Sequence, residues 1–465
     1  MFSNTLMKKS SEARRITVCT TLALTLFSCS SEPLPRTPGL RPSVMMVVVD
    51  TLRRDHLGAY GYGREVSPHI DAFAESAVVF DRAYAQSPST KPSMASLFTS
   101  TLPSHHGTIF NEHALPEHYV TLAEVFQSAG YETAGFGENP IIRADFDFDQ
   151  GFEEYETQSH RHSIRNDGPN DGFDRSVRDW LGDHAHEEFF LMVHYVDPHS
   201  PYWAPEPFRG RFSSTDGPAG QDLNVLSSDL EDVDEAIAKY DEEVLYIDQR
   251  FGGLLDRLDE LDIHDETIVI LLSDHGEAFG EHGQFHHSHS VYSELINIPL
   301  MISPNSQMKT GRRPEPVQHV DLFPTLMDLT GISIATLGLD DVQNLQGASL
   351  VDSKRSQLEQ RGVISEHLRV GWGDRMRSVV SGQLKLIEYL DSDRLEVFHA
   401  DLDPSDTIDQ RDATSPEVWN RLYALFPPLD EEGPPTVNPE IEIDPDLKEE
   451  LRMLGYLPEE HARAF

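Results

Sequence analysis

Three short polar clusters in this 465-residue chain carry carboxylates and imidazoles, the residue types that bind divalent metals. Asp50 follows an apolar run, His199 lies in HYVDPHSPY, and SDHGEAFGEHGQFHHSHS contains Asp274, His275 and His287. The two carboxylates and the imidazole of Asp50, Asp274 and His275 form a ligand set suited to zinc, manganese, calcium or magnesium. An aspartate after a strand is also a common helix cap, and SDHG a common turn, so the metal site is predicted from the clusters jointly.

A hydroxyl group accompanies these clusters in the segment SPSTKPSMASLF. Pro92 predicts a helix that opens here, so Thr90 is either its capping hydroxyl or a reactive group placed where the helix dipole favours an anion. A free threonine hydroxyl is a poor nucleophile and needs a metal or a base. Zinc lowers the pKa of bound water from about 15.7 to about 7, and an alkoxide would gain from the same polarisation. We therefore predict that Asp50, Thr90, Asp274 and His275 hold one divalent metal, with zinc favoured and calcium or manganese as alternatives, and that Thr90 is catalytic.

Two histidines and a lysine are the predicted substrate contacts. His199 and His287 are expected on the side where the leaving group departs, because an imidazole donates a proton or stabilises charge near neutral pH. Both are therefore predicted to be catalytic and substrate-binding. A buried, hydrogen-bonded role remains open for His199, which lies in a proline-bounded loop. Lys91 is adjacent to Thr90 and is predicted to bind substrate oxygens, with a solvent-facing position as the alternative.

The elements that must position these groups are three continuous apolar runs, SVMMVVV at 43–49, FFLMV at 189–193 and TIVILLS at 267–273. Such runs are typical of strands covered on both faces. Amphipathic stretches lie between them, and one has apolar residues at a helical period, namely Val244, Ile247, Phe251, Leu254, Leu255 and Leu258. This alternation predicts an α/β fold with a mainly parallel sheet flanked by helices. Ligands bind beyond the carboxyl ends of the strands in such sheets, and there the polar clusters would meet.

Changes of composition along the chain predict its domain organisation. We expect a lipoprotein-type signal at 1–29, a Pro-rich linker at 30–43 and a catalytic domain at 44–352. The segments RMRSVVSGQLKLIEYL, RLEVFHADLDP and SPEVWNRLYALF predict a smaller C-terminal α+β domain at 353–430. The acid-rich stretch PPLDEEGPPTVNPEIEIDPDLKEE predicts a solvated acidic tail over 431–465.

The net charge and the cysteines limit partners and location. The formal charge of −42 excludes nucleic acid as an expected partner, since a polyanion would be repelled. Basic residues precede ITVCTTLALTLFS, which is shorter than the roughly 20 apolar residues that a spanning helix needs. LFSCSS resembles a bacterial lipoprotein cleavage site with Cys29 as the lipidated residue, although an ordinary cleaved signal or a short anchor remains open. We therefore expect an exported lipoprotein of the periplasm or cell envelope, tethered to a membrane only by its N-terminal lipid. The chain has no cysteine besides Cys19 and Cys29, so no disulfide is expected.

Taken together, these motifs resemble the sulfatase family of the alkaline phosphatase superfamily. VVVDTLRRDHLGAYGYGREVSPHIDAFAESAVVFDRAYAQ is similar to the family's opening block, and SPSTKPSMASLFTSTLPSHHG to its nucleophile block. FFLMVHYVDPHSPY, SDHGEAFGEHG and VQHVDLFPTLMDLTGI follow in the family's order, and LRMLGYL resembles a tail common in bacterial members. The resemblance covers most of the chain after its signal, and it implies an alkaline-phosphatase-like fold and an ester-hydrolysing activity.

Three departures from the family pattern bear on the reaction. The family's Cys/Ser-x-Pro-Ser-Arg motif, whose first residue is converted to formylglycine, begins here with Thr90 and ends with Met94. Thr51 stands where the family has a second acidic metal ligand. Glu138 and Pro140 stand where many sulfatases carry a sulfate-binding lysine and histidine. These losses remove positive charge and the aldehyde hydrate of the usual sulfate-ester mechanism.

The remaining pattern is closer to superfamily members with a threonine nucleophile, such as phosphoethanolamine transferases. Their zinc ligands match Asp50, Thr90, Asp274 and His275, and the histidines beside their substrate phosphate match His199 and His287. Those transferases carry membrane helices that this sequence lacks, so the resemblance implies a hydrolase or transferase of phosphate, or less favourably sulfate, esters on a small-molecule, glycan or lipid substrate. One alternative is a sulfuric ester hydrolase that works without formylglycine. Another is a non-catalytic metal- or ligand-binding lipoprotein.

Overall fold

The structure is a computed structural model that describes residues 41–158, 170–215, 217, 219, 230–339, 342, 344–358, 361–429, 441, 443, 445–453 and 456. The predicted signal with Cys19 and Cys29, and nearly all of the predicted linker, lie outside the described residues. Among the helices of the described ranges, none combines the length and the apolar character needed to cross a membrane.

The central element is a mixed sheet, which has nine strands over the described residues. Its strands are β1 (Ser43–Val49), β2 (Val78–Tyr84), β3 (Glu132–Gly137), β4 (Glu154–Thr157), β5 (Phe189–Tyr195), β6 (Thr267–Ser273), β9 (Asn297–Ile298), β10 (Leu300–Ile302) and β11 (Gly311–Gln318). Their order is β11-β2-β10-β6-β1-β5-β3-β4, with β9 paired to β2. From β6 to β4 all neighbours are parallel, whereas β10 runs antiparallel to both β6 and β2.

The three apolar runs of the sequence form β1, β5 and β6, which lie side by side in this sheet. Every residue of the three strands is buried. Val49 of β1 pairs with Tyr195 of β5 and with Ser273 of β6, so the chain leaves all three strands at the same edge. Asp50 and Asp274 follow directly at that edge. The predicted α/β fold with a mainly parallel sheet flanked by helices is confirmed.

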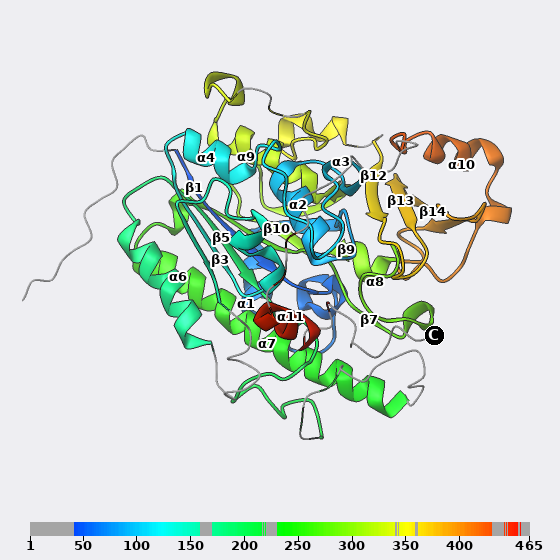
Figure 1. The fold of residues 1–465 in the computed structure, drawn as a ribbon, viewed down its shortest axis with the longest axis horizontal. Coiled ribbons are helices and arrows are strands. Elements are labelled where there is room, and N and C mark those ends of the chain that lie inside the picture. Colours follow the sequence, from blue (N-terminus) through cyan, green and yellow to red (C-terminus); the bar gives the residue numbers. More distant parts are fainter. Residues whose placement is uncertain are drawn as a thin grey trace, which may run out of the picture. The chain divides into compact units, whose positions relative to one another are not determined.

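Helices cover both faces of this sheet (Figure 1). They are α1 (Pro68–Ser76), α2 (Thr90–Thr99), α4 (Leu122–Ser128), α6 (Asp171–Asp183), α7 (Leu230–Glu260) and α9 (Leu322–Thr330). Two short helices, α3 (Pro103–His106) and α8 (Ser293–Ile296), lie in the same part of the chain. Alternate residues of β1 pack with α2, α4 and α9 on one face and with α1, α6 and α7 on the other. The predicted apolar face of α7 is buried apart from Leu255, which is partly exposed.

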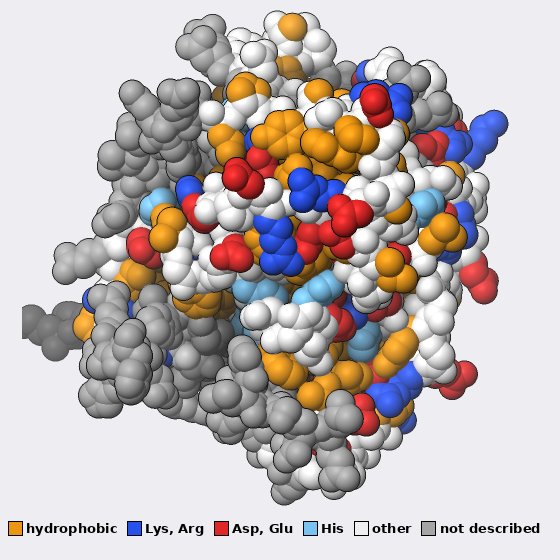
Figure 2. Space-filling model, turned by 90° about the vertical axis from the view of Figure 1, so that its right-hand side faces the viewer, with side chains coloured by type: hydrophobic (Ala, Val, Ile, Leu, Met, Phe, Trp, Pro, Cys, Tyr) orange, Lys and Arg blue, Asp and Glu red, His pale blue; other side chains and the backbone are white. Residues whose placement is uncertain are grey.

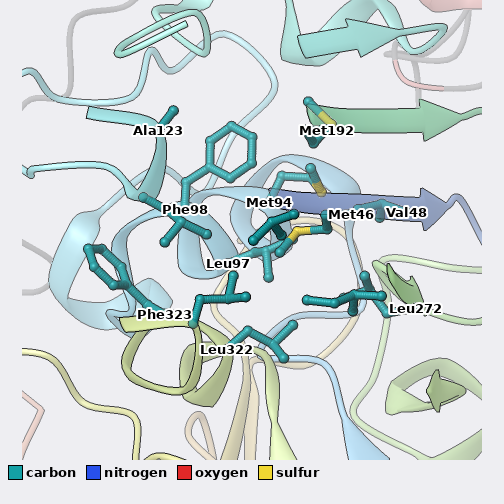
Figure 3. Close-up of a cluster of buried hydrophobic side chains, with 14 of the residues drawn as sticks. Met46, Val48, Met94, Leu97, Phe98, Ala123, Met192, Leu272, Leu322 and Phe323 are labelled. Carbon is teal, nitrogen blue, oxygen red and sulfur yellow. The ribbon is translucent and has the colours of Figure 1, made fainter. Parts of the chain in front are cut away.

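The helix that begins at Thr90 is buried along its whole length. Figure 3 shows Met94, Leu97 and Phe98 of α2 beside Met46 and Val48 of β1 and beside Leu322 and Phe323 of α9. Burial of each such side chain contributes about 1.5–3 kcal/mol. The packing therefore fixes α2 on the sheet and holds its first residue at the carboxyl edge of β1.

A second, antiparallel sheet follows in the C-terminal part of the chain. It consists of β12 (Val363–His367), β13 (Met376–Ser381), β14 (Leu384–Tyr389) and β15 (Leu395–His399), in that order. Helix α10 (Pro416–Tyr423) packs on β13 and β14. A separate two-stranded hairpin, β7 (Ala278–Phe279) with β8 (Phe285–His286), lies in the His-rich segment. The predicted smaller C-terminal α+β unit is present.

The expectation of a solvated acidic tail is wrong for the described part of that segment. Helix α11 (Pro445–Met453) lies against a short helical turn at Pro140–Ile142. Ile443, Leu447 and Leu451 are buried in the main core cluster. Their spacing of four residues forms an apolar helical stripe between the acidic residues. The overall acidity of the stretch hid this stripe, and Tyr456, which follows it, is also buried.

Candidate active site

Two buried aspartates form the centre of the candidate site. Asp50 follows β1 and Asp274 follows β6, and both are fully buried. Asp50 Oδ1 and Asp274 Oδ2 have no hydrogen-bond partner among the described residues. An orphaned carboxylate oxygen in the interior is costly unless a cation or a donor meets it. The pair therefore fits a bound divalent metal, as the sequence predicted for this edge of the sheet.

Two histidines complete a possible ligand set. His194 of β5 was not among the predicted ligands, yet Asp50, His194 and Asp274 each offer a ligand atom within 4.8 Å of one another. Neither ring nitrogen of His194 has a hydrogen-bond partner in the described part of the chain. His275 Nε2 lies 3.6 Å from Asp50 Oδ1 and 3.7 Å from Asp274 Oδ2. Its Nδ1 bonds to the carbonyl oxygen of Gly276 at 2.9 Å, which leaves the Nε2 lone pair facing the carboxylates.

Thr90 lies at the same centre. It is the first residue of α2, and Ser89 occupies the N-cap position, so the capping alternative for Thr90 is not what the structure contains. Thr90 Oγ1 is 3.1 Å from His275 Nε2 and donates to Asp50 Oδ2 at 3.5 Å. The four residues predicted from distant parts of the chain are thus gathered around one point.

The electrostatics of the two aspartates differ. Burial, and then the charge of Asp274, raise the pKa of Asp50 well above its usual value, while a hydrogen bond from Asn139 acts in the opposite direction. Burial also disfavours the ionised form of Asp274, but His275 and His194 outweigh it and hold its pKa below the usual range. Because the two pKa values shift in opposite directions, the negative charge of the pair resides mainly on Asp274. A cation between the two carboxylates would favour ionisation of both.

Main-chain contacts fix Asp274 and His275 in place. Asp274 Oδ1 accepts from the backbone N–H groups of Thr51 at 3.2 Å and His275 at 2.8 Å. Ser93 Oγ of α2 donates to the carbonyl oxygen of Asp274 at 2.6 Å. Thr51, which replaces the family's second acidic ligand, adopts a left-handed backbone with φ 54°. The turn after β6 is therefore bound both to α2 and to the turn after β1.

Replacement of Gly276 by alanine is expected to disturb this turn. A Cβ atom there would lie 2.0 Å from the carbonyl oxygen of Glu294, a contact that backbone atoms cannot relieve locally. We expect a loss of about 1–3 kcal/mol in the free energy of unfolding, together with weaker metal binding through His275. Urea unfolding and zinc titration measure the two effects. Gly172→Ala is the matched control, because its Cβ would enter open space; equal stability of the two variants would contradict the prediction.

His199 and His287 lie beside this centre. The ring centroids of His287 and His275 are 4.6 Å apart, and those of His199 and His287 are 4.9 Å apart. His287 Nδ1 bonds to Glu277 Oε1 at 3.1 Å, and His199 Nδ1 to the carbonyl oxygen of Ser200 at 2.6 Å. The Nε2 atom of His199 is buried without a partner in the described residues. Each Nδ1 is thus engaged, which leaves Nε2 as the atom for substrate.

Burial controls the protonation of these two imidazoles. It lowers the pKa of His199 to about 3, and it lowers the pKa of His287 well below 6.5, with neighbouring histidines adding to both effects. An anion bound between them would reverse this preference and favour the protonated forms, which alone can donate a proton from Nε2. Histidine side chains gather in the middle of the face drawn in Figure 2, so imidazoles are accessible from this side of the molecule.

Lys91 lies differently from the other predicted residues. Its side chain is fully buried, and its ammonium donates to the carbonyl oxygens of Asn111 at 2.5 Å and His113 at 2.9 Å. It also lies 3.2 Å above the ring of Phe146. Burial lowers the pKa of Lys91 well below 10.5. The ammonium thus supports the loop at 111–113, and the predicted contact with substrate would require it to leave these carbonyls.

Several residues of the site were not predicted. Asn139 Nδ2 donates to Asp50 Oδ2 at 2.6 Å, and Glu277 orients His287. Glu138, at a position where many sulfatases have a cation, is itself paired with Arg250 at 2.8 Å. His194 lies inside β5 opposite Val48, two positions before the level of Asp50, where the apolar pattern offers no signal for a ligand. Asn139 and Tyr456, which contact each other, had no such signal either.

The fold and the site together define a class of protein. A mainly parallel sheet with buried carboxylates, imidazoles and one hydroxyl at its carboxyl edge is the architecture of alkaline-phosphatase-like ester hydrolases. A family model described as Sulfatase matches residues 42–332, which is more than half of the chain. The chain therefore belongs to the sulfatase family.

Named relatives and solved structures agree with this assignment. The chain is 27% identical over 375 residues to the Ulvan-active sulfatase of Formosa agariphila, covering 71% of each protein. It is 24% identical over 420 residues to the Delta 4,5-hexuronate-2-O-sulfatase of Bacteroides thetaiotaomicron, covering 79% of this chain and 84% of that protein. These relatives are named as ester hydrolases, and the chain belongs to this enzyme class.

Two solved structures share the fold at low identity. A protein solved in complex with its substrate D-glucosamine-2-N,6-O-disulfate superposes with a TM-score of 0.68 at 18% identity, over 89% of this chain and 98% of the other. The phosphonate monoester hydrolase of Agrobacterium radiobacter superposes with a TM-score of 0.66 at 20% identity, over 86% and 100%. Identities this low support the shared fold and leave the substrate open.

Proposed function

We propose that this member of the sulfatase family cleaves or transfers phosphorus esters through a covalent intermediate on Thr90. The observation that carries the proposal is the position of Thr90 Oγ1, 3.1 Å from His275 Nε2 and 3.5 Å from Asp50 Oδ2. Asp50, Asp274 and His275 would hold one divalent ion, zinc being favoured, with Thr90 as a further ligand. His194 would supply another nitrogen. When bound, the ion supplies a Lewis acid that favours the alkoxide form of the hydroxyl.

The residues of the chain account for the bond changes. Thr90 Oγ1 forms a bond to phosphorus, and the bond from phosphorus to the substrate alcohol breaks. The hydroxyl of Thr90 lies within hydrogen-bonding distance of His275 Nε2 and Asp50 Oδ2, and its hydrogen leaves to one of these acceptors as the bond to phosphorus forms. His199 or His287 then gives a proton from Nε2 to the departing oxygen. Water, or an acceptor alcohol, then gives a proton to the same imidazole and attacks phosphorus. The bond to Thr90 breaks, and the Thr90 oxygen recovers its hydrogen from the group that had taken it.

A phosphorus ester is preferred to a sulfate ester because of the nucleophile. Threonine cannot become the aldehyde hydrate whose second hydroxyl releases sulfate in the usual sulfatase mechanism. The second candidate, a sulfuric ester hydrolase without formylglycine, is favoured by the names of the relatives, one of which acts on ulvan. A glycan ester is accordingly the first substrate class to test, alongside small-molecule and lipid esters.

One preparation of zinc-loaded protein distinguishes these candidates. We expect turnover of an aryl phosphate diester or aryl phosphonate monoester to exceed that of the matching aryl sulfate. Faster cleavage of the sulfate would support the second candidate. Absence of turnover on every ester, together with no phosphoryl adduct on Thr90 in an intact-mass spectrum, would support the non-catalytic alternative.

We also propose that the protein is an exported lipoprotein held at the cell envelope through Cys29. The support is the basic, apolar and cysteine-containing order of the N-terminal sequence. Expressed in a bacterial host, the full chain is expected to incorporate labelled fatty acid and to sediment with membranes. Cys29→Ala should lose the label and move most of the protein into the soluble fraction, whereas Cys19→Ala should keep both properties. A wild-type chain without label would contradict the proposal.

A further inference from the structure

A tyrosine from the far end of the chain reaches the candidate active site. Tyr456 is 5% exposed and belongs to the main core cluster. Its hydroxyl accepts a hydrogen bond from Asn139 Nδ2 at 2.6 Å. Its carbonyl oxygen accepts another from Asn111 Nδ2 at 3.0 Å. Both ends of the residue are therefore anchored, one of them directly beside the metal-binding carboxylates.

The contacts of Asn139 connect this tyrosine to the centre of the site. The same amide nitrogen donates its two hydrogens to Asp50 Oδ2 and to the Tyr456 hydroxyl, each at 2.6 Å. Asn139 Oδ1 accepts from the backbone N–H of Ile141 at 3.0 Å, so its orientation is determined. The Tyr456 hydroxyl is thus one side chain away from the carboxylate that accepts from Thr90.

The ring of Tyr456 faces the two histidines on the leaving-group side. Its centroid lies 5.2 Å from that of His199 and 6.4 Å from that of His287. A substrate held at Thr90 between these imidazoles would therefore lie next to the phenol. No other described residue of the C-terminal segment is in ring contact with either histidine.

The hydroxyl of Tyr456 is available as a donor. It accepts from Asn139, and the side chain of Thr90 lies next to it. Over the described residues it donates to no carboxylate and to no carbonyl oxygen. A phenol keeps its hydrogen at physiological pH and can donate it to an acceptor. A donor in this position can form a hydrogen bond with an oxygen of a substrate bound at Thr90.

We infer that Tyr456 is a substrate-binding residue whose hydroxyl donates to a non-bridging oxygen of the ester held at Thr90. This role rests on the proposed function. Glu138 and Pro140 leave that side of the site without the cations that many sulfatases have, and Glu138 is neutralised by Arg250. The tyrosine supplies a neutral donor instead of a charge. Tyr456 is, on this inference, part of the active site.

Tyr456→Phe tests the inference because it removes only the hydroxyl oxygen. We expect kcat/KM for the best ester of the panel to fall about tenfold, the effect of one hydrogen bond to an anion. Binding of inorganic phosphate to zinc-loaded protein, measured by calorimetry, should weaken by a similar factor. Zinc affinity should stay at the wild-type value, since the metal ligands are retained, and Tm should fall only slightly, since the ring is kept and only the hydrogen bond from Asn139 is lost. Tyr423→Phe, which removes an exposed hydroxyl bonded to Glu388, is the matched control.

The possible results distinguish the inferred role of Tyr456 from the proposed function. Unchanged turnover and unchanged phosphate binding in Tyr456→Phe, with an active wild type, would overturn the inference and leave the proposed function intact. Tighter phosphate binding or faster turnover would also overturn it, because the hydroxyl would then obstruct the site. A parallel fall in zinc affinity would assign Tyr456 a purely structural role through Asn139. A wild type that binds no phosphate and cleaves no ester would overturn the proposed function itself.

Discussion

Replacement of Thr90 by alanine is expected to lower kcat/KM by about 10⁴-fold or more while leaving the fold intact. Loss of a nucleophile removes the covalent route, and such losses in other hydrolases reach about 10⁶-fold. Thr90 is 1% exposed but contributes no cap to α2, because Ser89 occupies that position. The helix is fixed by its buried apolar residues, so Tm should change little. Steady-state kinetics on the best ester, with circular dichroism and Tm, provide the measurement.

Two further variants make the Thr90 experiment specific. Thr90→Ser retains a hydroxyl at the same position and should keep activity within about tenfold of wild type, since only a methyl group is lost. Ser89→Ala removes the neighbouring hydroxyl, which bonds to Ser288 Oγ at 2.7 Å, and should leave the reaction largely unaffected. Activity of Thr90→Ala equal to that of Ser89→Ala would exclude a covalent role for Thr90.

The central strands could be predicted because they are buried on both faces. β1, β5 and β6 are continuous apolar runs, which are typical of strands covered on both faces. The edge strand β11 could not, since GRRPEPVQ contains two prolines and two arginines and its pairing shifts register between Arg313 and Pro316. Proline is tolerated at a sheet edge, but a sequence that contains it argues against a strand.

The residues of the candidate site also differ in how well the sequence predicts them. Asp50, Asp274 and His275 follow buried strands, and the edge at which parallel strands end is a topological property that a sequence reveals. His194 lies inside a strand, where the apolar pattern does not tell which side chains meet the aspartates. Tyr456 lies at the site because the apolar stripe of α11 packs against the core. The acidic composition of that segment had instead indicated exposure to solvent.

Lys91 shows why adjacency in sequence is a weak predictor of contact. It follows Thr90 directly, but consecutive helix residues point about 100° apart. The lysine therefore reaches the loop at 111–113 rather than the carboxylates. A buried ammonium needs acceptors, and two backbone carbonyls supply them here. The lysine side chain thus stabilises the loop that contains Asn111, whose side chain donates a hydrogen bond to the carbonyl oxygen of Tyr456.

Replacement of Asp50 by asparagine is expected to have opposite effects on metal binding and on the stability of the metal-free protein. The variant loses one of the two carboxylates of the site, and zinc affinity should fall at least about 100-fold, with activity falling in proportion. In the metal-free protein, Asp50 is fully buried and one of its oxygens has no partner among the described residues. Removal of that buried charge should raise the free energy of unfolding by about 1–3 kcal/mol.

The stability difference between metal-free wild type and Asp50→Asn should depend on pH. Burial and the charge of Asp274 raise the pKa of Asp50 in the folded state above its value in the unfolded chain, near 3.8. A group with a raised folded pKa binds more protons in the folded state, so its contribution to stability is full below pH 3.8 and is lost as the pH rises through the folded pKa. Metal-free wild type should therefore lose up to about 1.4 kcal/mol per pH unit over that window relative to Asp50→Asn.

Addition of zinc should invert the order of the two proteins. A ligand at 100 times its dissociation constant stabilises the folded state by about 2.7 kcal/mol, and only the wild type would bind zinc that tightly. We therefore expect Asp50→Asn to have a higher Tm than wild type without metal and a lower Tm with it. Thermal unfolding at pH 7, first with chelator and then with zinc, measures both. Asp55→Asn, which alters an exposed carboxylate paired with Arg53, is the control that should show no such crossing. If Asp50→Asn were less stable than wild type under both conditions, Asp50 would be a structural residue, and the buried pair of carboxylates would need an explanation other than a cation.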